Sequence, residues 1–171
     1  MLEKQDVTIF IETQRQGLTV SLFDGEEDGE LDEEALEESV QEMPNDVEDG
    51  VDESEIMMEG KLIQTTHRVE LTYEESELTG MEGSKTKIGF DRACPDLIAM
   101  LRSGPVNTAL IFEPLKRHVC VYNTPFSSFE VCVHTLRVEN FLLERGELFV
   151  DYLIEIHGAR TERCKMTIRL R

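Results

Sequence analysis

Alternation of apolar and polar residues with a period of two constrains the fold of this chain more than any other feature. Near the end of the chain, every second position is apolar in two successive stretches. These positions are Leu148, Val150, Tyr152, Ile154 and Ile156, and then Cys164, Met166, Ile168 and Leu170. Successive side chains of a strand point to opposite faces of a sheet. The two stretches therefore predict half-buried strands that form a hairpin around residues 158–160.

The same alternation recurs upstream, where glycine, proline and serine separate the stretches and helical periodicity is scarce. The other expected strands cover residues 7–12, 61–67, 68–75, 85–90, 97–102, 109–113, 116–123 and 129–141. Roughly ten short strands, about 8 to 12 residues apart, are typical of an antiparallel barrel or sandwich. The last three strands follow one another closely, and we expect them to form a meander.

An acidic segment interrupts the first expected hairpin. Residues 24–59 hold 18 Asp or Glu and no Lys or Arg, whereas the rest of the chain holds 18 acidic and 17 basic residues. Runs of like charge repel one another and stay solvated. We therefore expect a flexible, largely disordered insertion at 24–59, between the first barrel strand or strands at 1–23 and the remainder of the same domain at 60–171. Residues 24–35 partly imitate a calcium loop, but Ala35 replaces the glutamate required at its last position.

Composition also restricts the compartment and the partners. Cys94, Cys120, Cys132 and Cys164 form no Cys-x-x-Cys pair, which favours reduced thiols in a cytoplasmic protein. The first residues do not resemble a secretory signal, and no apolar run is long enough to cross a membrane. A basic face is expected on the last strand, from Arg160, Arg163, Lys165, Arg169 and Arg171. No aromatic residues alternate with it and the chain is strongly acidic, so we expect no nucleic-acid partner.

Three short stretches resemble one known family. They are Thr72-Tyr73-Glu74-Glu75, then Thr86-Lys87-Ile88, and then Met100-Leu101-Arg102-Ser103-Gly104. Their order is similar to that in the YwiB-like family of uncharacterised bacterial proteins. The resemblance implies a single antiparallel meander β-barrel of the calycin or lipocalin-like type, with about 8 to 10 strands. It implies no activity and no catalytic residues. The acidic insertion departs from the family pattern, because a short turn is expected there.

Arg102 is the candidate ligand-binding residue, because it ends the apolar run at 97–101. A charged side chain at this place either leaves the barrel or is paired inside its mouth. In the first case that we consider, Arg102 binds a ligand carboxylate together with Tyr73 and Tyr122, while the apolar wall contacts the rest of the ligand. In the other case, Arg102 is paired with a structural carboxylate that closes one end of the barrel.

We interpret the chain as a non-catalytic barrel that binds a small, partly apolar or amphipathic ligand in its interior. A packed interior would argue against this interpretation. The alternative is a protein-interaction module, in which the acidic arm captures a basic partner surface. An enzyme stays open as a third interpretation, although the sequence provides no catalytic motif. The four histidines are isolated from one another, so we expect neither a metal site nor a cofactor.

Overall fold

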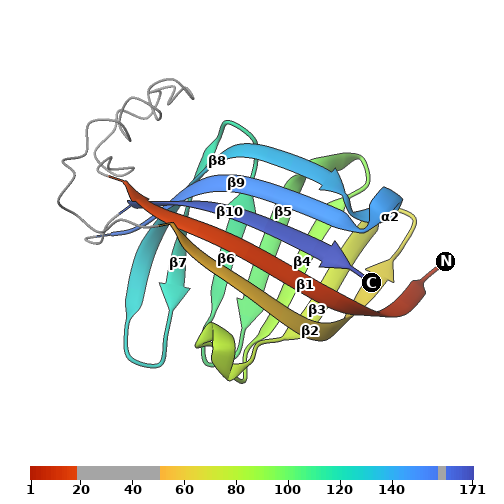
Figure 1. Ribbon diagram of the computed structural model, residues 1–171, viewed down its shortest axis with the longest axis horizontal. Coiled ribbons are helices and arrows are strands. Elements are labelled where there is room, and N and C mark those ends of the chain that lie inside the picture. Colours follow the sequence, from red (N-terminus) through yellow and green to blue (C-terminus); the bar gives the residue numbers. More distant parts are fainter. Residues whose placement is uncertain (19–50, 158–160) are drawn as a thin grey trace.

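Ten antiparallel strands make up most of the computed structural model, which describes residues 1–18, 51–157 and 161–171 (Figure 1). The strands are β1 (Glu3–Leu18), β2 (Asp52–Gln64), β3 (Arg68–Glu74), β4 (Lys85–Asp91), β5 (Cys94–Ser103), β6 (Thr108–Phe112), β7 (Arg117–Asn123), β8 (Ser128–Phe141), β9 (Glu147–Ile156) and β10 (Thr161–Leu170). Two single-turn helices join strands, η1 (Glu77–Thr79) and α2 (Leu142–Arg145). Every stretch that was expected to be a strand contains one, so the all-β prediction is confirmed. No helix within these ranges is long and apolar enough to span a bilayer.

The strands form one meandering sheet that is nearly closed into a barrel. The strand order is β6-β5-β4-β3-β2-β1-β10-β9-β8-β7, with the first and last strands of the chain side by side (Figure 1). Ile9 lies opposite Leu170 in this β1–β10 pair. The seam of the barrel lies between β6 and β7. It is joined by reciprocal backbone hydrogen bonds between Asn107 and Asn123, at N–O distances of 2.9 and 2.8 Å.

The structure corrects one boundary of the acidic insertion. Residues 52–59 were expected to belong to it, but they form the first part of β2. Their register with β1 places Ile56 opposite Ile11 and Met58 opposite Ile9. The inner-face side chain of Met58 packs against the core, and this apolar contact favours a strand in spite of the flanking carboxylates. The disorder expected for 24–50 and the rejected calcium loop at 24–35 lie outside the described residues.

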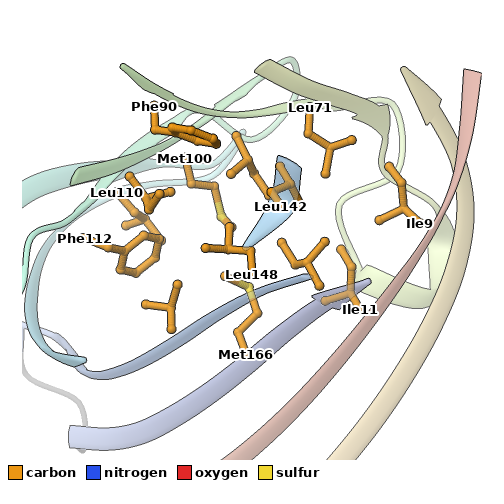
Figure 2. Close-up of a cluster of buried hydrophobic side chains, with 14 of the residues drawn as sticks. Ile9, Ile11, Leu71, Phe90, Met100, Leu110, Phe112, Leu142, Leu148 and Met166 are labelled. Carbon is orange, nitrogen blue, oxygen red and sulfur yellow. The ribbon is translucent and has the colours of Figure 1, made fainter. Parts of the chain in front are cut away.

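The apolar side chains of the inner face meet in one continuous core. Figure 2 shows Ile9 and Ile11 of β1 on one side of the cluster and Phe112 of β6 on the other, with Leu148 of β9 between them. Phe112, Leu148, Leu71 and Ile168 have 0% relative exposure. Leu142 of α2 joins the same cluster and covers one end of the barrel. This end is called the α2 end below.

Cross-strand register converts the alternation in the sequence into rows on the inner face. One row runs from β2 to β6 and is apolar throughout. It consists of Leu62, Leu71, Ile88, Met100 and Leu110. The next row towards the opposite end consists of Gly60, Tyr73, Thr86, Arg102 and Thr108. The inner face therefore changes from apolar to polar within two residues along each strand, and the polar end is called the mouth.

Candidate functional site

Four side chains of the mouth form a polar cluster, which comprises Tyr73, Glu75, Thr86 and Arg102. Tyr73 and Glu75 are two residues apart at the end of β3, so alternation points both of them inward. The register places Thr86 of β4 beside Tyr73, and Arg102 of β5 beside Thr86. Three neighbouring strands thus bring their polar inner-face residues to one point.

The cluster is a hydrogen-bonded ion pair that is almost fully buried. Arg102 Nε lies 3.1 Å from Glu75 Oε1 and 3.1 Å from Thr86 Oγ1, and the Thr86 hydroxyl donates to the same carboxylate oxygen. The Glu75 side chain is 1% exposed and the Arg102 side chain 10%. A buried charge is costly unless it is paired and hydrogen-bonded. Arg102 meets this requirement through Glu75, which is the structural carboxylate considered in the alternative for Arg102.

The structure brings together two of the three residues expected to bind a ligand. Tyr73 lies against Arg102, Thr86 and Glu75, and its pKa is raised by burial and secondly by the Glu75 charge. Its phenol is therefore neutral at physiological pH. Tyr122 of β7 directs its hydroxyl to Met81 Sδ, at 3.6 Å. Tyr122 thus faces the β3–β4 connection.

The inward-facing cysteines are not activated nucleophiles. Burial raises the pKa of the Cys164 thiol to about 11, and it also raises the pKa of Cys120. Both thiols remain protonated near neutral pH, and the protonated form is a poor nucleophile. Within the described part of the chain, no group of three or more His, Cys, Asp or Glu is arranged to hold a metal ion.

The basic face expected on β10 is largely neutralised by its neighbours. Arg163 makes a bidentate ion pair with Asp151, with Nε–Oδ1 and Nη2–Oδ2 distances of 3.0 and 2.7 Å. Arg169 is paired with Glu12 and Glu147. Arg171 lies over the ring of Phe10, with its guanidinium carbon 5.0 Å from the ring centroid. These side chains stabilise the contacts of β10 with β1 and β9; Arg160 lies outside the described residues.

A second candidate site lies on the outside of the mouth, where β2 separates from β3. β2 pairs with β1 from Asp52 to Gln64, but it pairs with β3 only from Gly60 to Gln64. A groove of about 380 Å³ opens at this fork, and Glu59, Lys61, Glu74 and Lys85 are among the residues that line it. Within the described ranges, residues 52–59 of β2 have no strand partner on the side away from β1.

Comparison with protein families decides the classification. The model described as "Domain of unknown function (DUF1934)" matches residues 39–168. The chain belongs to the DUF1934 family. Comparison with curated proteins gave no match.

The DUF1934 barrel is also similar to a solved structure, the ywiB protein from Bacillus subtilis. The alignment has a TM-score of 0.61 and 16% identity, and it covers 97% of this chain and 92% of that one. The resemblance expected from the sequence is therefore confirmed at the level of the fold.

Arg102 and Tyr73 were predicted from the sequence, whereas Glu75 and the open edge of β2 were not. Glu75 belongs to the stretch Thr72-Tyr73-Glu74-Glu75, and its spacing of two residues from Tyr73 places the two side chains on one face of a strand. That spacing was the available signal for the buried partner of Arg102. The open edge of β2 had no comparable signal, because it depends on where β3 ends relative to β2.

Proposed function

We propose that this DUF1934 chain is a non-catalytic protein-interaction module, in which an acidic segment on a β-barrel scaffold binds a basic segment of a partner protein. The observation that carries the proposal is the position of residues 52–59. They belong to the acidic segment, and they lie on a strand that extends beyond its β3 neighbour. A fixed backbone holds their carboxylates in place, so less conformational entropy is lost on binding.

The charge of this strand fits a basic partner. Asp52, Glu53, Glu55 and Glu59 are exposed, and no Lys or Arg occurs between positions 24 and 59. A surface of one sign attracts oppositely charged partners over about a Debye length, close to 10 Å at 0.1 M salt. Such steering raises the association rate and weakens as salt increases.

The packed interior favours this function over a ligand held deep in the barrel. The core side chains form one cluster that extends from Ile9 and Ile11 of β1, past Leu148, to Phe112 of β6 (Figure 2). Lipid-carrier barrels, in contrast, keep an enclosed cavity for the apolar part of the ligand.

A defined basic peptide tests the proposal. The probe is a fluorescent eight-residue peptide that alternates Lys with Val, and its control carries Glu in place of Lys. We expect the full-length protein to bind the Lys peptide and not the Glu peptide, with an affinity that falls as salt rises. Glu53→Gln/Glu55→Gln should weaken binding by about tenfold, whereas Asp96→Asn/Glu144→Gln, which removes the same charge at the α2 end, should leave it unchanged. Equal binding of both peptides, or of neither, overturns the proposal.

A small ligand at the mouth is the second candidate function, because Tyr73 and Arg102 lie together on the inner face. A ligand carboxylate would bind Arg102 beside Glu75 and Tyr73, with Tyr122 near Met81 of the β3–β4 connection. Native mass spectrometry of gently isolated protein tests this candidate. A reproducible extra mass that is lost on denaturation would support it, and a bare mass would contradict it.

A further inference from the structure

The unpaired edge of β2 offers backbone hydrogen-bonding groups as well as charge. Thr8 of β1 exchanges two backbone hydrogen bonds with Arg171, at 2.7 and 2.9 Å, so its backbone groups point away from β2. Consecutive residues of a strand direct these groups to opposite edges. The backbone N–H and C=O of Ile9 therefore point to β2, and those of its register partner Met58 point to β1. It follows that Met57, one residue before Met58, directs its N–H and C=O to the open edge.

The backbone near the other end of β2 is consistent with this orientation. The N–H of Thr65, eight residues after Met57, donates to the Arg68 carbonyl at the turn into β3, at 2.8 Å. At odd-numbered residues of β2, the backbone N–H and C=O thus point to β3 where β3 is paired with β2. At Glu53, Glu55, Met57 and Glu59, where β3 is not paired with β2, these backbone groups point to the open edge. An unpaired row of this kind is a template for an additional strand.

The side chains on the two faces of this edge select for a particular sequence pattern. On the outer face, Glu53 and Glu59 are held by Gln14 and Thr8 of β1, at 3.0 and 3.1 Å. Opposite charges on directly facing cross-strand residues stabilise a pair of strands. On the inner face, Ile56 and Met58 are partly buried apolar residues beside the mouth. An added strand would therefore carry basic residues outward and apolar residues inward.

The β2–β3 pairing stops at Gly60, which leaves this edge of β2 without a strand neighbour within the described residues. Gly60 is the first residue of β2 that is paired with β3, and an added Cβ would lie 2.6 Å from the Thr72 carbonyl oxygen. The backbones of β2 and β3 are thus close together at Gly60 and separate from Glu59 onward. The groove of about 380 Å³ lies at this point of separation, with Glu59 and Glu74 among its lining residues. Lys61, a basic residue at the closed end of the groove, is paired with Asp6 at 2.8 Å.

We propose that a basic, extended segment of a partner protein adds as a further strand to the edge formed by residues 52–59 of β2. Lys or Arg at alternate positions would face Glu53, Glu55 and Glu59, and the intervening apolar residues would cover Ile56 and Met58. The acidic edge disfavours pairing with a second copy of itself, because like charges would then face one another. This inference rests on the proposed function and adds the mode of binding to it.

A proline on the open edge tests strand addition without changing the charge. Met57→Pro removes an N–H that points to the open edge, and it preserves the backbone groups that face β1. We expect the variant to bind the alternating Lys-Val peptide about tenfold more weakly than wild type, a loss equivalent to one or two hydrogen bonds. Met57→Ala, the matched control, should bind within about twofold of wild type, because the Met57 side chain contributes little to an edge hydrogen bond.

Methylated peptides provide a test that leaves the protein unchanged. Two versions of the peptide carry N-methyl groups on the Lys amides or on the Val amides. Only one alternate set of amides faces the sheet in an added strand, so one version should lose binding and the other should retain it. This comparison decides the question if Met57→Pro fails to fold.

The outcomes separate the inference from the proposed function. Strand addition is overturned if the peptide binds in a charge-dependent manner while both methylated versions, and a folded Met57→Pro variant, bind like their unmodified counterparts. The proposed function would survive that result, as capture by charge alone. If wild-type protein does not bind the unmodified Lys peptide, both are overturned.

Discussion

The two ends of the barrel are built from the same ten strands but differ in chemistry. At the α2 end the inner face is apolar, and Leu142 covers it. At the mouth, the buried Arg102–Glu75 pair replaces apolar packing, and β2 continues past its neighbour. The comparison shows that the same alternating strands produce an apolar inner face at one end and buried, paired charges at the other.

The largest effect should come from opening a hole in the apolar core. Phe112 is fully buried, and its ring centroid lies 4.7 Å from that of Tyr152. Phe112→Ala should lower the free energy of unfolding by about 4 kcal/mol, from lost burial and the cavity left behind. Urea denaturation measures this loss, and Val121→Ala, at a half-exposed position, should change stability by less than about 0.5 kcal/mol. If both variants lost a similar free energy of unfolding, the prediction that Phe112 contributes much more to stability than an exposed residue would be wrong.

The second largest effect should come from splitting the ion pair of the mouth. Arg102→Met leaves the Glu75 carboxylate buried without its cation, which should cost about 3 kcal/mol. Glu75→Leu should cost a similar amount, because it leaves the guanidinium unpaired. The double variant should be clearly more stable than the sum of the two losses implies. Additive losses in urea denaturation would show that the two charges do not interact, and the mouth would then resemble an ordinary surface.

A smaller effect should come from adding a methyl group at the fork. The Cβ of Gly60→Ala would lie 2.4 Å from Ile9 Cδ1 and 2.6 Å from the Thr72 carbonyl oxygen. The side chain of Ile9 can move, but the backbone of β3 must shift, so we expect a loss of about 2 kcal/mol. Thermal unfolding compared with Lys61→Ala, at the exposed neighbouring position, measures it. An unchanged melting temperature in Gly60→Ala would show that the two strands separate without close contact.

The smallest effect concerns pH and His134 of β8. Burial, and secondly the charge of Arg117, hold the pKa of His134 below its ordinary value. The unfolded chain therefore binds a proton at a higher pH than the native chain does. The associated penalty is absent well above pH 6.5 or so and develops as the pH falls through the native pKa. Urea denaturation at pH 7.5 and at about pH 5.5 should show a larger loss for wild type than for His134→Gln, and equal losses would refute the prediction.

The alternation of residues predicted most of the fold, because a period of two depends only on local geometry. Each of the ten strands overlaps a stretch that the pattern predicted, and the hairpin of β9 and β10 has the expected pairing. The beginning of β2 was missed, because the run of carboxylates outweighed the short alternation that includes Ile56 and Met58. Contact with β1, distant in sequence, determines the conformation of that stretch.

The candidate site was predictable only where alternation extends to it. The sequence singled out Arg102 and Tyr73 as candidates and left open whether Arg102 points into the barrel. The structure places both on the inner face, where each continues the alternation of its own strand. Their closeness, and the separation of Tyr122 from both, depend on the register between strands. Register follows from turns and long-range packing, which a single sequence does not reveal. The open edge of β2 depends on the same information.

The pairing of β1 with β10 has a consequence for how the barrel forms. Each of the other strand pairs joins neighbours in the chain, whereas this pair places Ile9 opposite Leu170. Closing so long a loop costs entropy before any contact compensates for it, and folding slows as the mean separation of contacting residues rises. The strands β1 to β6 and the strands β7 to β10 can each form by pairing of successive hairpins, but neither set completes the shared core alone. During synthesis, the apolar inner face of the first six strands therefore stays exposed until β8 to β10 have been made and can pack against it.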